Sequence, residues 1–72
     1  MSKYIYIIEL TETTKSFPKK EFYKFEIGDI LHTTKNLTDA FMMESEDAAI
    51  DLSEYIESNF DYSAKIIEFK RT

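Results

Sequence analysis

The segment Lys3–Leu10, KYIYIIEL, constrains the fold more than any other part of the chain. Its β-branched and aromatic residues predict a strand, in which alternation places Ile5 and Ile7 on one face. The other face receives Tyr4, Tyr6, Ile8 and Leu10. A strand that is apolar on both faces is typical of the centre of a sheet covered from both sides. A chain of 72 residues has little material for two covering layers, so we expect one covered face.

Turn and strand signals place the other strands. EFYKFEI at Glu21–Ile27 predicts a second strand after a polar loop at 11–20, and Gly28-Asp29 predicts a two-residue hairpin turn into a third strand at Ile30–Thr34. A fourth short strand is expected at Ala40–Glu44 and a fifth at Ser63–Lys70. If these last two strands lie parallel in the sheet, the connection between them should be a right-handed crossover.

A single helix is expected between those two strands, at Glu46–Asn59. Ser45 is the predicted N-cap because its hydroxyl can accept a hydrogen bond from an early backbone N–H, and Asn59 can end the helix in the left-handed conformation. The apolar stripe of this helix consists of Ala49, Leu52, Ile56 and Phe60. The sequence therefore predicts one α+β domain over residues 1–72, in the order β-β-β-β-α-β. Its small mixed or antiparallel sheet has four to five strands, with the helix packed on one face.

One helix leaves the second sheet face without a cover, and this surplus of apolar surface suggests three outcomes. We expect the protein to form a homodimer, to bind a partner there, or to fold the 11–21 loop over the sheet. Aromatic residues of the kind that interfaces use are the candidates for self-association. They are Tyr4, Tyr6, Phe22 and Tyr23.

Composition excludes several kinds of chemistry. Without cysteine the chain has no disulfide, thiolate metal site or cysteine nucleophile, and one glycine excludes glycine-rich phosphate loops. His32 is the only imidazole, and Ser45 lacks the flanking glycines of a nucleophile elbow. We therefore expect no catalytic residues, no metal and no cofactor. The apolar runs are too short to span a membrane, and no secretory leader is evident, so a cytoplasmic protein is expected.

Charge is segregated along the chain. The net charge is −5, and the stretch 36–64 contains eight carboxylates and neither lysine nor arginine. Five acids on or beside the predicted helix are the candidate contacts to a partner protein with a basic surface. They are Asp47, Asp51, Glu54, Glu57 and Asp61. In the alternative interpretation, the protein is a small homodimeric assembly factor and these acids only maintain solubility.

Lysines cluster near Phe17 and Pro18. They are Lys15, Lys19, Lys20 and Lys24. Basic residues interleaved with aromatic residues are typical of proteins that bind nucleic acid. The acidic balance of the whole chain disfavours that function, because it repels the phosphate backbone.

The segment 41–72 resembles the C-terminal half of many small phage and prophage accessory proteins. The resemblance lies in the apolar FMME segment, the helix start Ser45-Glu46-Asp47-Ala48, and the final strand. It implies a non-enzymatic role in which the protein inhibits or modulates a host or defence protein in the host-cell cytoplasm. Small acidic phage proteins often do so as nucleic-acid mimics that occupy the nucleic-acid site of a basic target.

Overall fold

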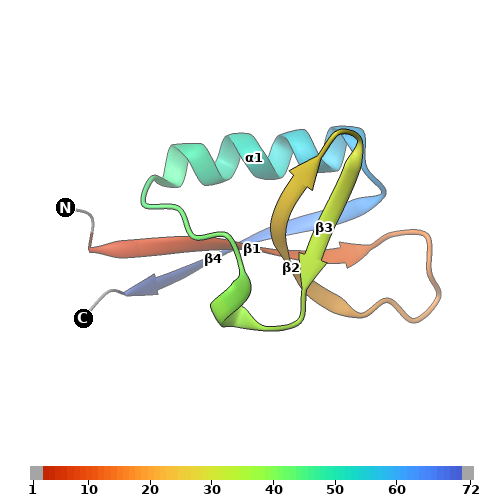
Figure 1. Ribbon diagram of the computed structural model, residues 1–72, viewed down its shortest axis with the longest axis horizontal. Helices are drawn as coiled ribbons and strands as arrows, with labels where there is room; N and C mark the ends of the chain where they lie inside the picture. Colours follow the sequence, from red (N-terminus) through yellow and green to blue (C-terminus); the bar gives the residue numbers. More distant parts are fainter. Residues whose placement is uncertain (1–2, 71–72) are drawn as a thin grey trace.

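The sheet is built around β1 (Tyr4–Glu12), as the computed structural model of residues 3–70 shows (Figure 1). The other elements are β2 (Lys20–Ile27), β3 (Ile30–Thr34), the short 3₁₀ helix η1 (Leu37–Asp39), α1 (Glu46–Asn59) and β4 (Tyr62–Lys70). The strands are antiparallel in the order β3-β2-β1-β4, and α1 packs on one face of the sheet. The predicted α+β class, with one helix on one sheet face, is confirmed.

The two neighbours of β1 pair with it to very different extents. β4 pairs with β1 along its whole length, from Tyr4 opposite Lys70 to Glu12 opposite Tyr62. β2 pairs with β1 only over Glu9–Thr11 and then diverges from it. In Figure 1, α1, β1 and β4 run together along the longest dimension of the molecule, while the β2–β3 hairpin crosses them at an angle.

The strand predicted at Ala40–Glu44 is not present, and one isolated antiparallel bridge takes its place. The N–H of Tyr6 donates to the carbonyl of Met43 at 2.8 Å, and the N–H of Met43 donates back at 2.9 Å. The N–H of Phe41 donates to the carbonyl of Tyr23 at 3.0 Å. The segment thus lies where β2 leaves β1, and because it bonds to both Tyr23 and Tyr6 it forms no continuous ladder with either strand. The bridge and β4 both run antiparallel to β1, so the two segments joined by α1 point the same way on opposite sides of β1.

The hairpin between β2 and β3 has the predicted turn. Gly28 has φ +61°, which a side chain would disfavour, and it is the one described residue with positive φ. A bulge at Lys24 shifts the register between Tyr23 and Phe25. As a result, Glu26 lies on the same face as the core residue Tyr23, and its carboxylate accepts a hydrogen bond from the hydroxyl of Tyr55 at 2.6 Å.

The bounds of α1 and its N-cap are those predicted. The hydroxyl of Ser45 accepts a hydrogen bond from the N–H of Ala48 at 3.3 Å. The prediction of a left-handed Asn59 is wrong, because no described residue other than Gly28 has positive φ. The side-chain amide of Asn59 donates instead to the carbonyl of Tyr55, and extended Phe60 ends the helix.

The core lies between α1 and the face of the sheet that carries the even-numbered residues of β1. Its buried members are Tyr6, Ile8, Leu10, Tyr23, Met43, Ala49 and Ile56. Leu52, from the predicted apolar stripe, packs against this cluster and is half-buried. Tyr6 and Tyr23, which were predicted to mediate self-association, are 8% and 9% exposed and belong to this core, so their side chains offer little surface to a second copy.

The second sheet face has no α-helix or further sheet layer over it within residues 3–70. The register identifies its apolar residues, which we call the open face: Ile5, Ile7, Phe22, Ile67 and Phe69. Ile7 is only 1% exposed, and the other four side chains are half-buried. Of the predicted self-association residues, Phe22 lies on the open face. Tyr4 is 37% exposed and alternates with Ile5, so it points to the other side of β1.

Candidate functional site

The outward side of α1 carries carboxylates at helical spacing. Asp47, Asp51 and Glu54 are exposed and lie one helical turn apart along the helix, opposite the side that buries Ala49 and Ile56. The Ser45 cap fixes the first turn of the helix, and Asp47 lies in that turn, where a carboxylate suits the helix dipole. The placement of these three predicted residues therefore leaves them accessible to a partner.

Exposed Ile50 lies among these carboxylates and was missed by the sequence analysis. Its side chain is 38% exposed, and the residues three or four positions away on the helix include Glu46, Asp47 and Glu54. The sequence did indicate this exposure, because Ile50 is an apolar residue that falls outside the predicted stripe of Ala49, Leu52 and Ile56. We call Ile50, Asp47, Asp51 and Glu54 the α1 outer face.

No cation neutralises the α1 outer face within residues 3–70. The two ion pairs of the described chain join Lys15 to Glu12 at 3.4 Å and Lys20 to Glu9 at 4.0 Å, and both involve β1. Uncompensated carboxylates on one helix repel one another slightly, and their fields add in the surrounding solvent. The arrangement can attract a basic surface, and added salt should screen this attraction.

The other two predicted acids have different surroundings. The carboxylate of Glu57 accepts a hydrogen bond from the backbone N–H of Ala64 in β4 at 2.9 Å. This N–H points away from β1, so Glu57 covers part of the free edge of the sheet. Asp61 is exposed beyond the end of α1, and its carbonyl accepts a hydrogen bond from Thr13 at 3.0 Å. Neither residue lies on the α1 outer face.

The remaining titratable groups do not form a catalytic arrangement in residues 3–70. His32 stacks on Phe25 across the hairpin, with ring centroids 4.6 Å apart. The pKa of Tyr55 is raised, first by its hydrogen bond to Glu26 and then by burial. Burial, and then the charge of Glu12, raises the pKa of Tyr62. No group of three potential metal-ligating side chains occurs in this part of the chain.

Comparisons with protein-family models, curated proteins and solved structures gave no match to this chain. The described part of the chain contains no helix with the length and hydropathy needed to cross a bilayer.

Proposed function

We propose that this chain is a non-enzymatic protein-binding module that engages a partner with a basic surface through the α1 outer face. The observation that carries the proposal is the 38% exposure of Ile50 among carboxylates that have no cationic partner in residues 3–70. Protein interfaces commonly combine a small apolar centre with a polar or charged rim. Ile50 supplies such a centre, and Asp47, Asp51 and Glu54 supply the rim.

The chemistry of this face defines the partner. A complementary surface needs an apolar depression for Ile50 and lysines or arginines that approach the three carboxylates. Charge complementarity of this kind mainly accelerates encounter and excludes acidic partners, and it weakens as ionic strength rises. Together with the resemblance to phage accessory proteins, it supports a protein that inhibits or modulates a host or defence protein in the host cytoplasm. A row of helix carboxylates that occupies a basic nucleic-acid site would act as a nucleic-acid mimic.

A pair of matched charge reversals tests this proposal. One variant replaces Asp47, Asp51 and Glu54 with lysine, and leaves Glu57 in place because it bonds to β4. The control replaces three exposed acids outside α1, also with lysine. They are Asp29, Asp39 and Glu68. Both variants change the net charge by the same amount. Circular dichroism verifies that each variant is folded before the immobilised proteins are used to capture partners from host lysate.

The expected result is that the wild type and the control capture the same partner, that the α1 variant does not, and that salt weakens capture. Ile50→Ser, which leaves every charge intact, should also reduce capture. Capture by the α1 variant at wild-type level would contradict the proposal.

The open face supports a second candidate, in which the protein is a homodimeric assembly factor and the acids only maintain solubility. The specific observation is that Ile5, Ile67 and Phe69 are half-buried at a face without a covering layer. Analytical ultracentrifugation at tens of micromolar should then show twice the 8.5 kDa mass of the chain. Ile67→Lys should shift that species to monomer, and a wild type that is already monomeric contradicts this candidate.

A further inference from the structure

β4 is an edge strand in the sheet order β3-β2-β1-β4 (Figure 1). The alternation within an antiparallel pair decides which of its backbone groups point to the free side. Tyr6 directs both its N–H and its carbonyl to Met43, so it does not bond to Glu68, the residue opposite it on β4. The N–H and the carbonyl of Glu68 therefore point away from β1. The same holds for Ile66 and Ala64, which lie two and four residues earlier on the strand.

One of these three positions is already covered by the protein. The N–H of Ala64 donates to the carboxylate of Glu57 at 2.9 Å. The N–H groups of Ile66 and Glu68 have no acceptor among residues 3–70. An edge strand with unpaired donors and acceptors is a template for pairing with another strand. We call the outward backbone groups of Ile66 and Glu68 the β4 edge.

One side of α1 lies above the β4 edge. Its residues follow the spacing i, i+4, i+7 and i+11 and are Glu46, Ile50, Ser53 and Glu57. The bond from Ala64 to Glu57 fixes this side toward β4. α1 and β4 run in opposite directions (Figure 1). The seven helical residues from Glu57 back to Ile50 span about 10 Å, which equals about three strand residues beyond Ala64. Ile50 therefore lies above the β4 edge.

Glu46 and Glu57 flank exposed Ile50 on this side of α1 with negative charge. Neither carboxylate forms an ion pair within residues 3–70, because both ion pairs of that range involve acids of β1. The side chain of Glu68 adds little to this charge, since Lys70 lies two residues on along the same side of β4 and offsets it. A strand added at the β4 edge thus meets an apolar residue between two carboxylates.

The other side of β4 determines what the alternate residues of an added strand would contact. Ile67 and Phe69 lie there, half-buried on the open face. Because successive residues of a strand point to opposite faces, one set of side chains would extend the open face and the other would lie beside α1. The matching segment is extended. It has apolar residues in the first set, and basic residues on both sides of one apolar residue in the second.

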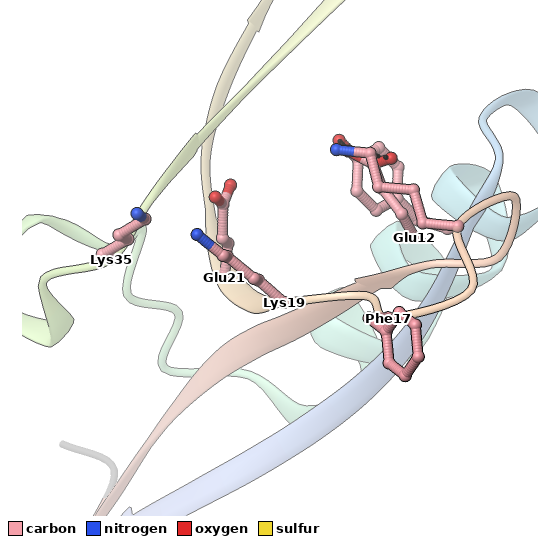
Figure 2. A pocket seen from close by; sticks show the side chains of 7 residues that line it. Glu12, Phe17, Lys19, Glu21 and Lys35 are labelled. Atoms are coloured by element: carbon pink, nitrogen blue, oxygen red, sulfur yellow. Dashed lines mark hydrogen bonds and ion pairs between the residues drawn. The ribbon is translucent and has the colours of Figure 1, made fainter.

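The pocket of about 260 Å³ beside the loop after β1 gives no comparable surface for a basic segment. Glu12 in this pocket forms an ion pair with Lys15 at 3.4 Å. Figure 2 shows the ammonium groups of Lys19 and Lys35 on the side of the pocket that carries the Glu21 carboxylate. Carboxylates with lysines beside them attract a basic segment less than the two carboxylates of α1 that flank Ile50.

We propose that the β4 edge receives an extended segment of a partner protein, with alternating apolar and basic residues, as an additional strand. A second copy of this chain suits the edge less, because pairing of two β4 edges would bring together two α1 sides that both carry Glu46 and Glu57. The inference rests on the proposed protein-binding function, since Ile50 belongs to the α1 outer face and also lies above the β4 edge. It adds the form of the partner, in which main-chain hydrogen bonds supply affinity and alternate side chains supply specificity.

A proline at the β4 edge tests this inference. Glu68→Pro removes one donor from the free edge and leaves the ladder to β1 intact, because that N–H points away from β1. Glu68→Val is the matched control, since it removes the same carboxylate and keeps the N–H. Circular dichroism verifies that both variants are folded. The probe is the synthetic peptide Thr-Lys-Val-Leu-Val-Lys-Thr with blocked ends, and amide NMR titration of the full chain measures its affinity.

The peptide should shift the amides of Ile66 and Glu68 in the wild type, and Glu68→Val should bind it equally well. Glu68→Pro should bind it at least tenfold more weakly, because strand addition depends on main-chain bonds. Glutamate in place of the two peptide lysines should weaken binding to the wild type at least tenfold. No binding to the wild type, or equal binding by the two variants, would overturn strand addition. Shifts of the same amides on raising the protein concentration without peptide would assign the edge to a second copy and also overturn it.

Two N-methylated forms of the peptide make the test independent of how well Glu68→Pro folds. Each form carries methyl groups on one set of alternate backbone nitrogens, and an added strand donates to β4 from one set alone. One form should therefore retain binding while the other loses it at least tenfold. Equal binding of both forms contradicts strand addition. The proposed function is contradicted by a different result, capture by the α1 charge-reversal variant, so the two failures are distinguishable.

Discussion

Ile7 and Ile8 are adjacent in β1 and almost equally inaccessible, at 1% and 0% exposure, yet they are buried by different means. Ile8 lies under α1 in the core with Leu10 and Ile56. Ile7 lies on the open face, where side chains of the same sheet surround it, including Ile67 directly opposite on β4. The comparison shows that neighbours in one layer can exclude water from a central residue without a second layer. A second layer should add packing contacts that solvent exposure does not measure.

The largest expected effect is on the covered side. Ile8→Ala should lower the free energy of unfolding by about 4 kcal/mol, since it leaves a cavity between the sheet and a helix whose backbone limits collapse. Urea denaturation followed by circular dichroism measures this loss. A loss under about 1 kcal/mol would mean that the α1 side of the sheet repacks freely.

The matching change on the open face should cost less. Ile7→Ala should lower the free energy of unfolding by about 2 kcal/mol, because the half-buried neighbours can relax into the space. The same denaturation experiment provides the comparison with Ile8→Ala. Equal losses that grow with protein concentration would show that a second copy covers the open face in solution.

A smaller effect is expected at the start of the covering helix. Ser45→Ala should cost about 1 kcal/mol, because the N–H of Ala48 loses its acceptor. Thermal unfolding measures this change, and Ser45→Asp, which retains an acceptor, should be near wild type. Equal destabilisation by both substitutions would contradict the capping role.

The smallest effect concerns the hydrogen bond from the hydroxyl of Tyr55 in α1 to the carboxylate of Glu26 in the hairpin. The hydrogen bond to Glu26 is the main cause of the raised pKa of Tyr55. In the unfolded chain this tyrosine releases its proton at a lower pH than in the folded protein. Its stabilising contribution is therefore present below about pH 10 and is lost as pH rises further. Above pH 10, Tyr55→Phe should lose stability less steeply than wild type. Identical slopes in urea denaturation would contradict this assignment.

The sequence was sufficient to predict the elements whose signals are local. The period of the apolar residues located α1, the Ser45 hydroxyl located its start, and Gly28 located the hairpin turn. The uncovered sheet face also followed from the two apolar faces of β1. These features depend on residues that are close in sequence, so a pattern of a few residues contains the information.

Features that depend on distant segments could not be predicted. The Ala40–Glu44 segment has strand-like residues, but its backbone bonds are divided between Tyr23 and Tyr6, so it pairs with β1 only at Met43. The bulge at Lys24 reversed the alternation after Tyr23, so that Glu26 instead of Phe25 lies on the side of α1. The pocket lined by Glu12, Lys19, Glu21 and Lys35 combines separate segments of the chain, so the lysine cluster near Pro18 revealed only part of it.

The short contact between β2 and β1 has a consequence for local opening. The β2–β3 hairpin is joined to the rest of the molecule by the pairing at Glu9–Thr11, by the backbone bond from Phe41 to Tyr23 and by the side-chain bond from Tyr55 to Glu26. β1 and β4 are held together over nine residue pairs. Backbone amides of β3 should therefore exchange with deuterium through separation of the hairpin, while the amides that join β1 to β4 require global unfolding. The molecule then behaves as two cooperative units, of which the hairpin is the one that opens first.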